Sequence, residues 1–140
     1  MRLKEQRAWD TFKRHIDQRR LKIKRIENLI GNGMSDTIGI NRAYGEAFWL
    51  EFKALDAWPA RDRTCPLRDV FEPGQLPFLQ EWNEWRGHGF VILRVGVEEW
   101  FLFDGMLELI EMNREELEST ALASGLDRIM EYLTDLRHED

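Results

Sequence analysis

The chain has 140 residues, 43% of them hydrophobic and 33% charged, with a net charge of −6. This composition predicts a single folded domain over residues 1–140 and argues against a tight, non-specific nucleic-acid binder. No apolar run is long enough to cross a bilayer, and the charged start leads into no signal segment. The single cysteine, Cys65, excludes an internal disulfide. We therefore expect a cytoplasmic protein in a reducing compartment.

One helix and three strands are predicted in the first part of the chain. Apolar residues at helical spacing predict an amphipathic helix over Leu3–Arg19. Alternating apolar and basic residues predict a half-exposed strand over Leu21–Ile26. Strands over Asp36–Ile40 and Ala47–Leu55 flank a turn, which predicts a hairpin.

The segment from Ala54 to Gly74 lacks periodicity and contains three prolines. Such long loops are usually functional or disordered, so we expect this one to be unpacked and mobile. The elements predicted after it are a helix over Gln75–Arg86, strands over Phe90–Val95 and Trp100–Phe103, a helix from Asn113 to about Ser124, and a last helix through Leu136.

The connection from Lys53 to Phe90 passes through a helix, so we expect their two strands to be parallel. The order of elements then predicts an α/β sandwich around a small mixed sheet. The core would span about residues 3–105, and a helical C-terminal extension would span about 106–140.

Two charged residues interrupt the apolar strand Ala47–Leu55. Glu51 and Lys53 point to the same face because side chains alternate along a strand. Leaving either charge buried and unpaired would cost several kcal/mol, roughly, so both need compensation. A structural salt bridge would provide it, and so would a divalent metal held by Asp36 and Glu51 with Lys53 beside a reacting water.

Positive charge is concentrated in residues 1–53, which hold 12 Lys and Arg against 7 Asp and Glu. This distribution predicts either a phosphate-binding face or an ordinary solvated surface. The candidate DNA-binding residues are Lys22, Lys24 and Arg25 in the first strand and Arg61, Arg63 and Arg68 in the long loop.

Most histidines and tryptophans are expected to be structural. His15, His88 and His138 show no metal-ligand spacing and are interpreted as surface or loop residues. Trp58, in the arginine-bearing loop, is expected to wedge against bases. The tryptophans expected to pack in the core are Trp9, Trp49, Trp82, Trp85 and Trp100.

Five features occur in the order found in a known nuclease superfamily. They are Glu5 on the first helix, the loop Gly33-Met34-Ser35-Asp36, the motif Glu51-Phe52-Lys53 after a hairpin, the helix start Gln75-Leu76-Pro77, and the segment Gly87-His88-Gly89-Phe90 leading into a strand. Together they resemble the PD-(D/E)XK nucleases, and among these the small VRR-NUC and Holliday-junction-resolvase-like members. Ser35 stands where the family has proline.

This resemblance implies a restriction-endonuclease-like core and a Mg²⁺- or Mn²⁺-dependent DNA endonuclease acting on branched or junction DNA. It assigns metal binding to Asp36, Glu51 and the Phe52 backbone carbonyl, with Glu5 as a further metal ligand. Lys53 would orient or deprotonate the water or stabilise developing charge, and Gln75 would hydrogen-bond the water or Lys53. It also implies a homodimer.

Three alternatives remain open from the residues themselves. Glu5 could be a solvated glutamate in the first helical turn, and Gln75 could simply cap its helix. The whole chain could be a non-catalytic nuclease-like module that binds DNA or a partner protein.

Overall fold

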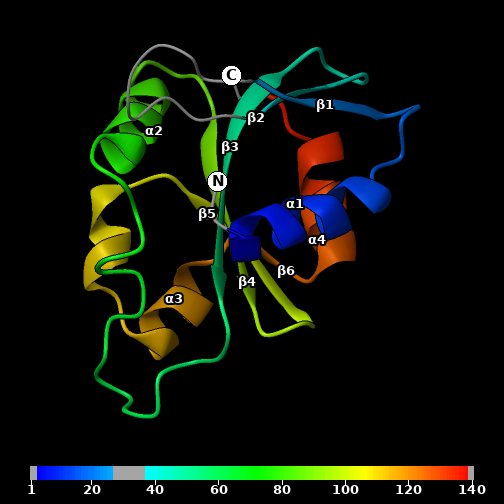
Figure 1. Cartoon of the computed structure of the whole chain (residues 1–140). Coiled ribbons are helices and arrows are strands. Elements are labelled where there is room, and N and C mark those ends of the chain that lie inside the picture. Colours follow the sequence, from blue (N-terminus) through cyan, green and yellow to red (C-terminus); the bar gives the residue numbers. More distant parts are fainter. Residues whose placement is uncertain (1–2, 27–36, 139–140) are drawn as a thin grey trace.

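The computed structural model describes residues 3–26 and 37–138 (Figure 1). Its centre is a six-stranded mixed sheet with the strands in chain order from β1 to β6. The strands are β1 (Leu21–Arg25), β2 (Thr37–Asn41), β3 (Ala47–Leu55), β4 (Gly89–Val95), β5 (Glu99–Asp104) and β6 (Ala123–Ser124).

The predicted parallel pairing is confirmed, because β3 and β4 lie side by side in parallel with Glu51 opposite Val91 and Lys53 opposite Leu93. Every other neighbouring pair in the sheet is antiparallel. The strands β3 and β4 are central and buried on both faces, which explains why their sequences are almost continuously apolar.

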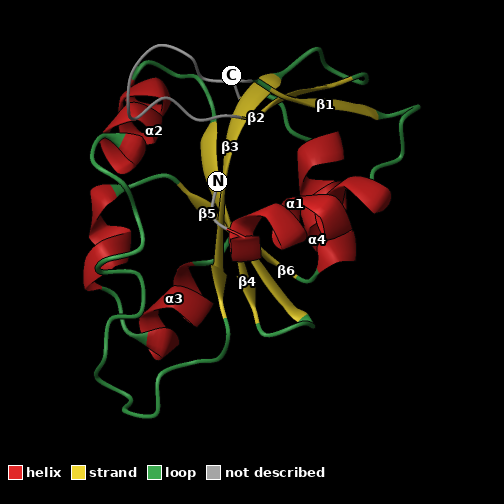
Figure 2. Cartoon of the chain, viewed as in Figure 1, coloured by secondary structure: helices red, strands yellow, loops and turns green. Residues whose placement is uncertain are grey.

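Helices cover both faces of the sheet. They are α1 (Leu3–Arg14), α2 (Gln75–Glu84), the 3₁₀ helix η1 (Leu107–Glu111), α3 (Arg114–Thr120) and α4 (Leu126–Thr134). α1 and α4 lie on one side of the sheet, and α2 and α3 lie on the other (Figure 2). The result is the predicted α/β sandwich. Among the described residues, no helix is both long and apolar enough to span a membrane.

Alternate residues of β3 point to opposite faces of the sheet and belong to two separate hydrophobic cores. Phe48, Leu50 and Phe52 join the cluster that packs under α1 and α4. Trp49 and Leu55 belong to the opposite cluster, under α2 and α3. Glu51 and Lys53 therefore share the second face with these apolar residues, and both are buried.

Two predicted helix boundaries were wrong. The first helix ends at Arg14 rather than Arg19. The helix after Asn113 begins with the expected cap but ends at Thr120, because the following residues pair with β5 as the short strand β6. Backbone bonds from Leu122 and Gly125 to β5 hold this strand in place, so the C-terminal extension is not purely helical.

The long segment between β3 and α2 is packed, contrary to the prediction. Leu67 is fully buried in the core under α2 and α3, and Val70 and Phe71 pack against the same core. These apolar residues have no regular spacing because the segment has no regular secondary structure. Their burial could therefore not be recognised from periodicity.

Candidate active site

A buried ammonium group and two buried carboxylates meet beside β3. The Lys53 Nζ lies 3.1 Å from the Glu5 Oε1 and 3.9 Å from the Glu51 Oε2. The exposed fractions are 2% for Lys53, 5% for Glu51 and 8% for Glu5, so all three charges are largely removed from water. Charges this deeply buried persist only where other groups compensate them.

Glu5 reaches this cluster because of the way α1 docks. The apolar face of the helix carries Trp9 and Phe12 onto Phe52, with edge-to-face ring contacts at 5.5 and 5.2 Å. At the first turn, Lys4 pairs with Asp56 just beyond β3 at 2.7 Å. The interpretation of Glu5 as a solvated glutamate is therefore wrong.

The last part of the long loop, just before α2, contacts the cluster. The Phe71 ring lies 5.2 Å from the Lys53 Nζ, a distance at which an aromatic face attracts a cation. Four residues later, the Gln75 side chain accepts a hydrogen bond from the Glu72 backbone N–H at 2.9 Å. This contact joins Gln75 to the turn before α2 and does not support the capping alternative, since the N-cap of α2 is Gly74 and no side-chain capping bond is seen among the described residues. The catalytic role of Gln75 remains a proposal.

The hydrogen bonds of β3 show in which direction the backbone carbonyl of Phe52, a predicted metal ligand, points. The Trp49 N–H donates to the His88 carbonyl and the Leu55 carbonyl accepts from Gly96, so the odd-numbered residues direct their backbone groups to β4. Phe52 therefore directs its carbonyl toward the β2 side of the strand. The described pairing with β2 ends at Leu50. A metal ligand role for this carbonyl is compatible with that direction.

Asp36, the predicted metal ligand of the hairpin, lies outside the described residues. Thr37, which follows it in sequence, is the first residue of β2 and pairs with Leu50, the neighbour of Glu51.

The predicted DNA-binding residues are all exposed. Lys22 and Lys24 project from β1, at the edge of the sheet. Arg25 on the same strand donates to the Gln6 side chain of α1. The loop arginines Arg61, Arg63 and Arg68 lie on the segment that ends at Phe71, and their role in DNA binding remains a proposal.

The fold was compared with those of solved structures. The chain is similar to the structure of Hjc, a Holliday junction resolvase from the archaeal hyperthermophile Archaeoglobus fulgidus. The TM-score is 0.59 with 11% sequence identity, and the alignment covers 91% of this chain and 98% of that chain. The chain has a restriction-endonuclease-like fold. No protein-family model and no curated protein matches the sequence.

Within this restriction-endonuclease-like fold, three tryptophans depart from their predicted roles. Trp58 does not project toward solvent as a base wedge, because its Nε1 donates to Glu99 at 2.9 Å and its ring packs on Phe101. Trp82 and Trp85, predicted to lie in the core, are 45% and 81% exposed. Both are on or just after α2, at the outer surface of the sandwich.

A second polar cluster was not predicted from the sequence. Glu46, His88 and His138 each offer a ligand atom within 4.8 Å of the others. His88 and His138 lie in loops, as expected, but the fold brings them together with Glu46, which the sequence did not indicate. Their spacing gives no signal because the three residues come from three separate segments. Only the parallel pairing of β3 with β4 could have suggested that Glu46 and His88 are neighbours.

Proposed function

We propose that this protein is a divalent-metal-dependent endonuclease that hydrolyses phosphodiester bonds in branched or junction DNA. The observation that carries the proposal is the buried cluster of Lys53 with Glu5 and Glu51, in a fold shared with a Holliday junction resolvase. Buried titratable groups gathered around one strand are typical of functional sites.

The donor set fits a hard divalent cation. Glu5 and Glu51 bring two carboxylates to the Lys53 ammonium, so the cluster offers hard oxygen ligands. Carboxylate and carbonyl oxygens are the ligands that Mg²⁺ and Mn²⁺ prefer. We assign metal binding to Glu51, Asp36 and the Phe52 carbonyl, with Glu5 as a further ligand. When bound, the ion would acidify a water and offset charge on the phosphate.

Lys53 has the best-defined role among the chain's own groups. The Lys53 ammonium pairs with Glu5, and the Phe71 ring contacts it as well, so its position is restricted. A lysine held in this way can orient the attacking water or stabilise negative charge that develops on the phosphate. Gln75 would hydrogen-bond the same water or Lys53.

DNA binding is assigned to the exposed basic residues. Lys22, Lys24 and Arg25 lie at the edge strand, and Arg61, Arg63 and Arg68 lie in the loop that leads to Phe71. A DNA substrate would place the protein inside the cell. We further propose a homodimer, which would supply two sites for paired cuts; sedimentation of the purified chain tests it.

A cleavage panel tests the proposed function directly. Linear duplex, flapped duplex and four-way-junction DNA are each incubated with the chain and Mg²⁺, Mn²⁺ or a chelator. Cleavage of branched DNA with either ion, and none with the chelator, supports the proposal. Binding of junction DNA with no cleavage under any condition would instead establish the non-catalytic module.

A further inference from the structure

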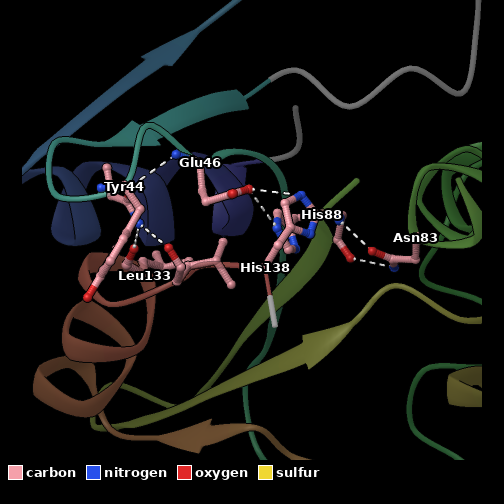
Figure 3. A network of polar contacts seen from close by, with 9 residues as sticks. Tyr44, Glu46, Asn83, His88, Leu133 and His138 are labelled. Atoms are coloured by element: carbon pink, nitrogen blue, oxygen red, sulfur yellow. Dashed lines mark hydrogen bonds and ion pairs between the residues drawn. The ribbon is translucent and has the colours of Figure 1, made fainter. Parts of the chain in front are cut away.

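The cluster of Glu46, His88 and His138 lies where three segments of the chain converge (Figure 3). Glu46 immediately precedes β3, and His88 immediately precedes β4. These two strands are parallel neighbours, so their starting ends lie side by side, and the Trp49 N–H donates to the His88 carbonyl at 2.9 Å. His138 comes from the segment that follows α4.

Two of the three distances between ligand atoms are close to those in a tetrahedral metal site, and the third is within 4.8 Å. The Glu46 Oε2 lies 3.1 Å from the His88 Nε2 and 3.2 Å from the His138 Nε2. In a tetrahedral zinc site with bonds of about 2.0 to 2.1 Å, neighbouring donor atoms are about 3.3 Å apart. The two imidazole rings are stacked with centroids 4.9 Å apart. Binding an ion would therefore require only small movements of these side chains.

Backbone-directed hydrogen bonds fix the segments that carry the ligands. The buried Asn41 side chain donates to the carbonyls of Leu133 and Leu136, at 3.0 and 2.7 Å, and accepts from the N–H of Glu46 at 3.1 Å. It thus joins the start of β3 to the end of α4. On the other side, Asn83 bonds both backbone groups of Gly89, the residue after His88. Such preorganisation reduces the entropy lost when an ion binds.

The donor set also selects the class of ion. Two imidazole nitrogens and one carboxylate suit borderline transition ions such as Zn²⁺, whereas Mg²⁺ prefers oxygen ligands alone. The site therefore differs in chemistry from the carboxylate cluster around Lys53.

We propose that Glu46, His88 and His138 bind one Zn²⁺-class transition ion, which clamps the segment after α4 onto the start of β3 and β4. With three protein ligands, a water completes a tetrahedral shell. The role proposed for the ion is to join these segments, and it does not depend on the proposed nuclease activity.

Calorimetric titration of the full chain with ZnCl₂ tests the site, with excess Mg²⁺ present to occupy the carboxylate cluster. We expect one Zn²⁺ per chain. His138→Gln and Glu46→Gln should each weaken binding by at least about 100-fold, since even outer-shell changes cost roughly 10- to 100-fold. His15→Gln, which alters the third histidine, just after α1, is the matched control and should bind like the wild type. Co²⁺ in place of Zn²⁺ should give the visible absorption of a low-coordinate site, and His138→Gln should lose it.

Hydrogen exchange then tests the clamp. Zn²⁺ should slow exchange of the backbone amides near the end of α4 in the wild type and leave them unchanged in His138→Gln. His138 is exposed, so this variant should fold, which circular dichroism verifies. Absence of saturable Zn²⁺ binding overturns the proposal, because the cluster would then be only a set of polar contacts. Undiminished binding by His138→Gln, or loss of binding in Glu51→Gln instead, overturns it as well.

Discussion

Glu5 and Lys53 are 48 residues apart in sequence, yet their side chains form an ion pair of 3.1 Å in the interior of the protein. The sequence motif suggested Glu51 as the partner of Lys53, but the Glu51 carboxylate lies farther away, at 3.9 Å. Residues two apart on a strand project side by side and do not converge. The first helix therefore supplies the nearer carboxylate and ties Lys53 to α1.

This arrangement predicts that the two glutamates differ in their effect on stability. Glu5→Gln should lower the free energy of unfolding by about 3 kcal/mol, because it removes the closest partner of a buried ammonium. Glu51→Gln should change it by less than about 1 kcal/mol, because Glu5 continues to compensate Lys53. Urea denaturation of both variants without metal measures the difference. If Glu51→Gln proves the more damaging variant, the Glu51–Lys53 pair is the structural salt bridge and the catalytic assignment fails.

Metal binding can be measured without activity. Mg²⁺ at ten times its dissociation constant should raise the stability of the wild type by about 1.4 kcal/mol. Thermal melts should show this gain reduced or absent in Glu51→Gln. His138→Gln, which alters the other cluster, is the control and should respond to Mg²⁺ like the wild type. An equal gain in Glu51→Gln would place the Mg²⁺ site elsewhere.

Lys53 is expected to act in the chemical step. Lys53→Met should reduce the single-turnover cleavage rate far more than DNA affinity, because the ammonium stabilises the transition state rather than the bound substrate. Lys53→Arg should also cleave slowly, since a planar guanidinium does not fit the position of a compact ammonium. Lys13→Met, at an exposed lysine on α1, serves as the control. Wild-type rates in either Lys53 variant would remove this residue from the mechanism.

The loop arginines are expected to bind the DNA backbone. Changing Arg61, Arg63 and Arg68 to glutamine should weaken binding to every DNA substrate. It should also reduce the slope of log affinity against log salt by up to about 0.9 for each phosphate that is no longer neutralised. Fluorescence anisotropy at several salt concentrations measures both effects, and Arg128→Gln on α4 is the control. An unchanged slope would shift the assignment to Lys22 and Lys24 on β1.

Much of the fold could be predicted because the strongest patterns belong to its centre. The limits of β3 agree with the prediction, since a strand buried among neighbours on both sides must be nearly all apolar. The crossover through α2 then determined that β4 lies parallel to it. By contrast, β6 has two residues, too few to produce any periodicity.

From the residues alone, the candidate sites could be predicted only where their members are close in sequence, and it was the family resemblance that grouped Glu5 with Glu51. Glu51 and Lys53 were found from their alternation on one strand. The distance from Glu5 to Lys53 depends on how α1 docks through Trp9 and Phe12, which local pattern does not encode. Likewise Glu46, His88 and His138 meet only after three elements have packed, and Leu67 is buried without belonging to any periodic segment.

Cleavage of a four-way junction by the wild type and by Glu51→Gln, on samples with matched thermal melts, tests the central claim most directly. We predict that the wild type cuts the junction in Mg²⁺ or Mn²⁺, that a chelator abolishes the reaction, and that Glu51→Gln binds the junction with similar affinity but does not cut it. A folded Glu51→Gln variant that cleaves at the wild-type rate would contradict the assignment of this cluster as the active site.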